Sequence, residues 1–134
     1  MARIGATAAA LLAAAALGGC AIAVQQPQEA AAQLYHSYLR VAIEHPQFVY
    51  EKQDILKMPE REGMKYTLFA GMALDTAQRI YLLTGERSAQ WVATVKSIIA
   101  NHHTYIILNF AACPDLDREF VEFLKREVKG YECK

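Results

Sequence analysis

The clearest pattern of apolar positions lies between residues 88 and 110. The apolar residues recur at three- and four-residue spacing, as along one side of an α-helix: Trp91, Val95, Ile98, Ile99, Ile106 and Phe110. Neither glycine nor proline interrupts the segment. A helix with so much apolar surface must be covered by its neighbours. The pattern therefore predicts one continuous helix around which the other elements pack.

A second long helix is expected between residues 60 and 84. Pro59 fits the first turn of a helix, acidic residues follow it, and Gly85 fits a C-terminal cap. Its packing face has helical spacing and consists of Phe69, Met72, Ala73, Thr76, Ile80 and Leu83. Gly71 has small neighbours and is expected where another helix approaches closely. Because Ser88 can cap the next helix, the two should form an antiparallel hairpin.

Two shorter helices are expected before and after this hairpin. The first covers residues 29–44 and ends at His45-Pro46, because a proline disfavours helical backbone in the residue before it. Residues 47–58 are ambiguous, since Phe48, Ile55 and Leu56 could line a short helix or hold a loop. The last helix matches the helix dipole at both ends, with Asp115, Asp117 and Glu119 at its start and Lys125, Arg126 and Lys129 near its end.

No segment shows the two-residue alternation of a β-strand. The predicted fold class is therefore all-α, with an N-terminal apolar signal or anchor helix followed by a small up-and-down helical bundle. The expected organisation is a signal peptide or membrane anchor over residues 1–24, a short polar tether over 25–28 and a helical domain over 29–134. The length of 134 residues suits one domain plus a targeting segment.

The first residues of the chain, MARIGATAAALLAAAALGGCAIAVQ, have the layout of a secretory signal. One cation, Arg3, precedes an uncharged stretch from Ile4 to Val24 that ends at polar residues. The stretch is mostly alanine, so it is less hydrophobic than a usual transmembrane helix of about 20 residues. Export or membrane attachment is therefore expected.

The end of this stretch, Leu17-Gly18-Gly19-Cys20, resembles the lipobox of bacterial lipoproteins, which consists of leucine, two small residues and an invariant cysteine. In that family the signal is cut before the cysteine, whose thiol receives a diacylglyceryl group. The resemblance implies that Cys20 becomes the lipidated first residue, with Leu17, Gly18 and Gly19 as recognition positions. Two or three acyl chains hold a soluble domain on a bilayer where one chain holds it only marginally.

Other outcomes stay open for this segment. Ala21-Ile22-Ala23 fits the A-x-A rule of an ordinary signal peptidase, which would release a soluble protein that starts at Val24. Without cleavage, the segment would remain as an N-terminal membrane anchor. A cytosolic protein that buries an alanine-rich helix is the remaining alternative.

Charge and composition narrow the choice of partner. The chain has 14 basic and 14 acidic residues, which gives a formal net charge of zero. It has no basic stripe with interleaved aromatic residues, so nucleic acid is not an expected partner. The expected partners are the membrane, through the N-terminal lipid or anchor, and an unidentified protein.

Two cysteines remain if Cys20 carries lipid. An even pair in an exported protein invites a disulfide. However, Cys113 and Cys133 flank a predicted helix of about 15 residues, whose ends lie about 22 Å apart. Unless the helix is shorter than this, a short C-terminal tail does not close that distance to the Cα separation of about 7 Å that a disulfide allows. Free thiols, or an intermolecular bridge through Cys133, are therefore expected.

Three of the four histidines, His36, His102 and His103, are candidates for a speculative ligand or metal site. His102 and His103 point about 100° apart on a helix, so they cannot chelate one metal from one face. A site made of His36, His102 and a carboxylate such as Glu44 would need the fold to bring them together. The alternative is a hydrogen-bonded histidine at the edge of a helical core. No metal and no cofactor is predicted.

No catalytic motif is recognisable. The chain lacks GxSxG, a glycine-rich phosphate loop, GxGxxG, HExxH and CxxC. Tyr35, Tyr38 and Tyr105 could line a small pocket between helices, although packing at the edge of the core accounts for them as well. Enzymatic activity is therefore not the expected role.

The expected function is that of a bacterial cell-envelope protein, a lipid-anchored helical module for binding or structure that faces the periplasm or the exterior. The alternative is a single-pass anchored or periplasmic helical domain that senses a ligand or a metal. In layout alone, the body resembles uncharacterised small bacterial membrane and envelope proteins that join an N-terminal apolar segment to a helical remainder. That likeness implies no activity.

Overall fold

The computed structural model describes residues 15–49, 55–108 and 115–133, with side chains described from residue 26 onward. All regular secondary structure within these ranges is helical, which confirms the predicted all-α class. The α-helices are α1 (Ala15–Glu44), α2 (Pro46–Val49), α3 (Glu60–Thr84), α4 (Ala89–Asn101), α5 (His103–Ile107) and α6 (Arg118–Glu127). Two short 3₁₀ helices, η1 (Ile55–Lys57) and η2 (Gly85–Arg87), precede and follow α3.

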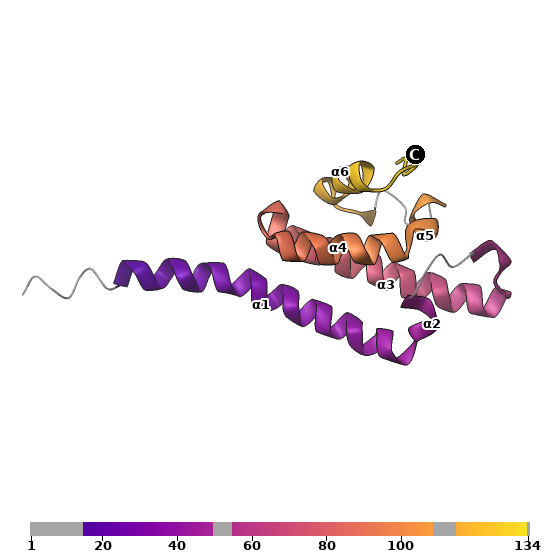
Figure 1. Ribbon diagram of the computed structural model, residues 1–134, viewed down its shortest axis with the longest axis horizontal. Coiled ribbons are helices and arrows are strands. Elements are labelled where there is room, and N and C mark those ends of the chain that lie inside the picture. Colours follow the sequence, from indigo (N-terminus) through magenta and orange to yellow (C-terminus); the bar gives the residue numbers. More distant parts are fainter. Residues whose placement is uncertain (1–14, 50–54, 109–114, 134) are drawn as a thin grey trace, which may run out of the picture.

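α3 is the central helix of the bundle (Figure 1). It contacts α1, α2, α4 and α6, and with α4 it forms the predicted antiparallel hairpin, closed by η2. Three of its alanines, Ala70, Ala73 and Ala77, are fully buried. Small side chains let neighbouring helices approach closely, so α3 can be covered from several sides. The expectation that the other elements pack around residues 88–110 is therefore wrong.

The predicted continuous helix over residues 88–110 is interrupted at His102. This residue has φ −115° and ψ 23°, outside the helical range, and separates α4 from α5. Its amide bonds to the carbonyl of Ile99, and its carbonyl accepts from the amide of Ile106. The ring of His102 is buried, and it contacts the rings of Tyr66 and Phe69 on α3. The helix thus breaks where the side chain of His102 packs against α3, although the sequence has no glycine or proline there. Phe110, the last residue of the predicted apolar face, lies outside the described residues.

α1 runs without interruption through residues 25–28, which were expected to form a short polar tether. Pro27 lies inside this helix, although an interior proline usually costs about 3 kcal/mol because it removes a backbone donor. Among the side chains described, which start at residue 26, contacts with the bundle are found from the same turn onward: Gln28 accepts a hydrogen bond from the indole of Trp91, and Ala31 is fully buried. The residues after Pro27 are therefore held in helical register by packing.

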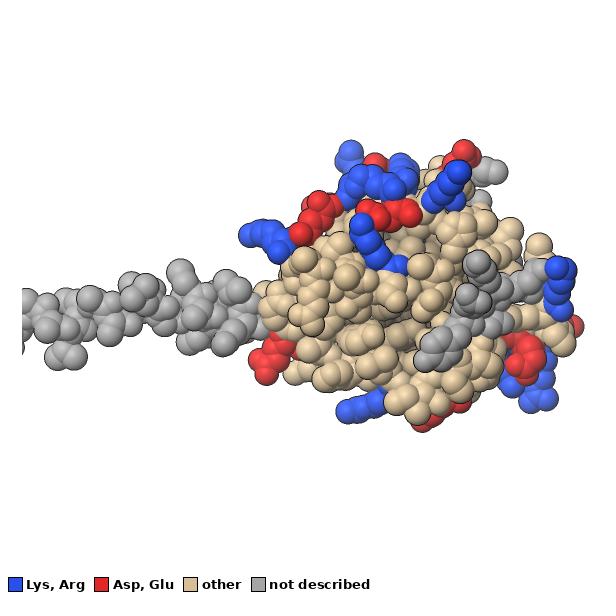
Figure 2. All heavy atoms as spheres, viewed as in Figure 1, with Lys and Arg blue, Asp and Glu red and all other residues tan. Residues whose placement is uncertain are grey.

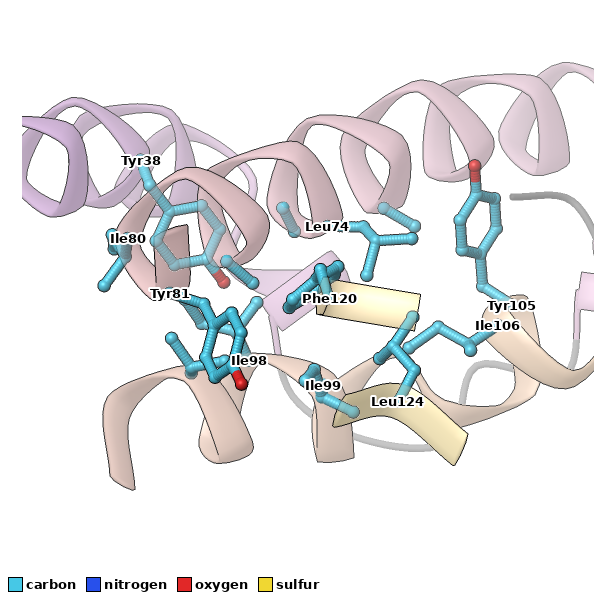
Figure 3. Packing of buried hydrophobic residues seen from close by; sticks show 14 of the residues in the cluster. Tyr38, Leu74, Ile80, Tyr81, Ile98, Ile99, Tyr105, Ile106, Phe120 and Leu124 are labelled. Atoms are coloured by element: carbon cyan, nitrogen blue, oxygen red, sulfur yellow. The ribbon is translucent and has the colours of Figure 1, made fainter. Parts of the chain in front are cut away.

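The core is one cluster of apolar side chains to which α1 and α3 to α6 all contribute (Figure 3). The predicted positions in α4 and α5 are buried, namely Trp91, Val95, Ile98, Ile99 and Ile106. On α3, Phe69, Ala73, Thr76 and Ile80 are buried as expected, whereas Met72 is half-buried. Figure 3 shows Phe120 and Leu124 of α6 beside Leu74 of α3 and Ile106 of α5. Burial of this cluster is the main source of stability, since each large apolar side chain contributes about 1.5–3 kcal/mol.

Two leucines depart from the predicted pattern. Leu83 is 42% exposed, because it follows the last buried positions of α3 at the end of the hairpin. Leu56 is 74% exposed in η1, while Phe48 is buried in α2 and Ile55 is half-buried. The ambiguous stretch 47–58 thus holds two short helical pieces, and residues 50–54 between them lie outside the description.

The helix ends follow their sequence signals. α1 ends before His45-Pro46, and Gly85 ends α3 with φ +60°, a conformation that favours glycine. Asp117 caps α6, because its carboxylate accepts a hydrogen bond from the amide of Glu119 at 2.8 Å. Ser88 occupies the cap position of α4, although its side chain makes no capping bond.

Gly71 marks a close approach, but the neighbour is a side chain of α5. A Cβ atom at Gly71 would lie 3.3 Å from the hydroxyl oxygen of Tyr105. That spacing is tighter than most carbon–oxygen contacts, so the absence of a side chain at Gly71 leaves room for Tyr105. The predicted contact exists, and its partner is an aromatic hydroxyl group.

Among the described residues, no helix combines the length and the apolar character needed to cross a membrane.

Candidate functional site

The predicted lipid-attachment residues lie near the start of α1. Leu17, Gly18, Gly19 and Cys20 belong to this helix by their backbone, but their side chains lie outside the described part, as do residues 1–14. In Figure 1 the first turns of α1 extend beyond the bundle. Ala31 is the first buried residue among those described. At 1.5 Å per residue, Cys20 lies about 16 Å before it along the helix axis.

Cys133 is disulfide-bonded and packs against the core, so the expectation that its thiol is free is wrong. The physical reason is that α6 has 10 residues rather than about 15. After it, Gly130 adopts φ +88° and the amide of Tyr131 bonds back to the carbonyl of Val128, so the tail turns rather than extending. The other two cysteines, Cys20 and Cys113, lie outside the residues whose side chains are described.

The three candidate histidines have different environments. His36 is exposed on α1, His102 is 1% exposed at the α4–α5 junction, and His103 is half-buried at the start of α5. The described side chains include no group of three or more histidine, cysteine, aspartate or glutamate residues that could hold a metal ion. Within this part of the chain, the fold therefore does not assemble the speculative site.

His102 is buried at the α4–α5 junction, where its ring contacts side chains of α3. Its Nδ1 lies 3.1 Å from the hydroxyl oxygen of Tyr66, a hydrogen bond in which either group can donate. The ring centroids of Tyr66 and Phe69 lie 5.8 and 5.7 Å from that of His102. Its Nε2 atom is buried and has no hydrogen-bond partner among the described atoms. His102 is thus a core histidine, and only one of its two ring nitrogens has a partner within the described part of the chain.

Burial governs the protonation of this pair. Loss of solvent lowers the pKa of His102 from 6.5 to about 4, because the charged imidazolium would be poorly hydrated. Burial likewise raises the pKa of Tyr66 to about 12. Both groups are therefore neutral at pH 7. In this state His102 offers a hydrogen bond and packing surface, and it acquires a charge only under acidic conditions.

His103 lines a groove of about 820 Å³ between α4, α5 and the end of α6. Lys96 and Glu127 lie in the same groove and form an ion pair at 2.8 Å across it. The remaining lining residues are Ile99, Ala100, Thr104 and Val128. The groove has room for a small amphipathic ligand, although its two charged groups already satisfy each other.

The three tyrosines considered as pocket residues take part in packing. Tyr35 stacks on Tyr38 with ring centroids 6.1 Å apart and meets Trp91 edge-on. Tyr38 also contacts Phe69, and Tyr105 places its hydroxyl against Gly71. Tyr38 and Tyr105 are buried. The contacts of Tyr35 and Tyr38 join α1 to α3 and α4, and the contact of Tyr105 joins α5 to α3.

Two further grooves flank α3. One, of about 720 Å³, lies where η2 meets the start of α6, and it is lined by charged residues that include the ion pair of Glu86 with Arg126. The other, of about 350 Å³, is mostly apolar and lies between α1, α2 and α3, with Leu68 and Met72 in its lining. On the face seen in Figure 2, basic and acidic side chains of the described residues alternate, so it shows no basic stripe for nucleic acid.

Tyr66 and Gln28, the hydrogen-bond partners of His102 and Trp91, were not singled out from the sequence. Tyr66 follows the helical spacing of Phe69, Ala70 and Ala73, so its burial was readable from the pattern. Its pairing with His102 was not, because the partners are 36 positions apart. Gln28 and Trp91 are 63 positions apart, and no local signal links them.

Comparison with protein-family models, with curated proteins and with solved structures finds no match to this chain. Functional inference therefore rests on the residues and their geometry alone.

Proposed function

We propose that this chain is a bacterial cell-envelope protein, held on a membrane by lipid on Cys20 and facing the periplasm or the exterior. Its helical body then serves as a binding or structural module without catalysis. The observation that carries the proposal is the sequence Leu17-Gly18-Gly19-Cys20 at the end of an alanine-rich segment that follows a single cation, Arg3.

The position of Cys20 along α1 supports this proposal. The residue precedes the buried part of α1 by about 16 Å, and the first turns of the helix extend beyond the bundle (Figure 1). Cleavage before Cys20 would keep every described side chain, from residue 26 onward, in the mature chain. The helix that remains would connect the lipid directly to the core.

The disulfide at Cys133 also supports export, because disulfides persist in oxidising compartments and are rare in the cytosol. In Figure 1 the start of α1, the helix that contains Cys20, lies far from the C-terminus of the chain. We infer that the thiol of Cys20 stays available for lipid.

The described grooves favour binding or structure over catalysis. Two pairs of their charged side chains are engaged with each other, Lys96 with Glu127 and Glu86 with Arg126. A catalytic centre usually combines a nucleophile, a base and an orienting group within hydrogen-bond distance. His102, whose pKa lies far from neutrality, has Tyr66 as its hydrogen-bond partner and carries no adjacent nucleophile among the described contacts.

Expression of the full chain in a bacterium tests the proposal directly. The wild-type protein should partition into the membrane fraction, and its mass should correspond to a chain that starts at Cys20 and carries acyl groups. The Cys20→Ser variant should lose the acyl mass and keep the signal segment or be cut elsewhere. The matched control Cys133→Ser should retain the lipid. A Cys20→Ser product with the wild-type membrane partition and no mass change beyond the substitution contradicts the lipoprotein proposal.

A further inference from the structure

The turn between α3 and α4 carries exposed leucines at the end of the bundle from which α1 emerges. Leu82 and Leu83, in the last turn of α3, are each 42% exposed. In Figure 1 this turn lies beside α1, and the first turns of α1 extend past it in the direction away from the bundle. The hydrogen bond between Gln28 and Trp91 links the two elements at this level.

The length of α1 sets the distance between this turn and a lipid anchor. Cys20 precedes Gln28 by about two helical turns, which corresponds to about 12 Å along the axis. The headgroup layer of a bilayer is about 5–7 Å thick on each side of the hydrocarbon core. With its acyl chains inserted, Cys20 lies at this layer. A tilt of α1 therefore brings the α3–α4 turn into contact with the membrane surface.

The side chains of the turn suit such a contact. Leucines at a membrane surface bury their apolar atoms below the headgroups. Arg87 is exposed and has no ion pair among the described residues, so its guanidinium can remain among lipid phosphates while its stem lies over apolar surface. The neighbouring Glu86 is paired with Arg126, which offsets its negative charge.

We propose that the α3–α4 turn rests in the headgroup layer of the bilayer to which Cys20 is anchored, with Leu82 and Leu83 as the apolar contacts and Arg87 at the lipid phosphates. This inference rests on the lipid anchor proposed above. It gives the bundle a fixed orientation, with α2 and the start of α3 pointing away from the membrane. Exposed Leu68 then faces the surrounding medium.

Trp91 is the only tryptophan of the chain and lies in the first turn of α4, next to the proposed contact. The lipidated full-length protein is reconstituted into phosphatidylcholine vesicles, with and without a lipid that carries a fluorescence quencher on its headgroup. The wild-type protein should show strong quenching of Trp91. The double variant Leu82→Ser/Leu83→Ser should lose most of this quenching, whereas the matched variant Leu68→Ser should keep the wild-type value.

Flotation of the same vesicles separates the two proposals. Protein that floats without quenching of Trp91, or with equal quenching in the wild type and the double variant, overturns the membrane contact and leaves the anchor intact. Protein that does not float overturns the anchor and the contact together. A protein partner bound to the same leucines predicts no quenching in protein-free vesicles, which also overturns the contact. Far-ultraviolet circular dichroism of each variant verifies that the helices remain formed.

Discussion

A buried aromatic ring nitrogen lies at each end of α4, and the two nitrogens differ in their hydrogen bonding. At the start of the helix, the indole N–H of Trp91 donates to the side-chain oxygen of Gln28. Just past the other end, Nε2 of His102 is buried without a partner among the described atoms. Burying an unpaired polar atom costs about 1–3 kcal/mol. We therefore expect the α3–α4 turn to be stable over a wide pH range, and the α4–α5 junction to be the place where acid loosens the fold.

The largest effect is expected from a cavity near the α3–α4 turn. Ile80 is fully buried in the core cluster, so Ile80→Ala should lower the free energy of unfolding by roughly 3–4 kcal/mol through lost burial and an unfilled cavity. Denaturant unfolding followed by circular dichroism measures this change. The nearby Leu83→Ala, at a 42% exposed position, should cost less than about 1 kcal/mol. Equal costs for the two variants would show that this end of the core is loosely packed.

The second effect concerns the pH dependence of stability at the α4–α5 junction. The folded pKa of His102 is about 4 and its unfolded value is 6.5, so the unfolded chain binds the proton first as the pH falls. The contribution of His102 is complete above pH 6.5 and decreases as the pH is lowered towards 4. The shift corresponds to about 3 kcal/mol over this window, measurable by denaturant unfolding at a series of pH values.

Two variants sharpen this test. His102→Phe removes the titrating group, so its stability should change less between pH 7 and pH 4 than that of the wild type. His36→Gln changes an exposed histidine and should leave the wild-type pH profile in place. If His102→Phe and the wild type have the same pH profile, the buried imidazole is not the acid-sensitive group.

A smaller effect is expected from the partner of His102. Tyr66→Phe removes the hydroxyl that bonds to Nδ1 and leaves both imidazole nitrogens unsatisfied. The free energy of unfolding should fall by about 2 kcal/mol. In the control Tyr81→Phe, the lost hydroxyl donates a hydrogen bond to the exposed Glu86. The free energy of unfolding should therefore fall by less than about 1 kcal/mol. A Tyr66→Phe protein as stable as the wild type would argue that water replaces the hydroxyl.

The smallest effect is expected at the paired nitrogen. Gln28→Ala removes the acceptor of the Trp91 indole, which should cost about 1 kcal/mol and shift the emission of this single tryptophan. Gln33→Ala, an exposed position of the same helix, should leave the emission unchanged. An unchanged emission spectrum in Gln28→Ala would show that the indole nitrogen of Trp91 does not depend on Gln28, which contradicts the proposed difference between the two ends of α4.

Helices and their ends could be predicted because their signals are local. The proline of His45-Pro46, the left-handed Gly85 and the capping Asp117 each act on the backbone of adjacent residues. The burial of Val95 and Ile106 likewise follows from spacing alone. These features depend on residues that are close in the sequence, so they can be predicted from one sequence.

The features that the sequence did not yield depend on distant neighbours. The break at His102 occurs where its ring packs against side chains of α3. The central position of α3 depends on its buried alanines, whose small size has an effect only where other helices pack against them. The disulfide of Cys133 depends on a shorter α6 and a tail that turns back. His36 and His102 were both candidates for one ligand or metal site, whereas the fold buries His102 and exposes His36.

The central claim, a helical bundle tied to a membrane through Cys20, is tested most directly by the intact mass of the mature protein isolated from bacterial membranes. The expected protein begins at Cys20, carries acyl groups and contains one disulfide. A mass that includes Met1, or one for an unmodified chain that starts at Val24, would contradict it.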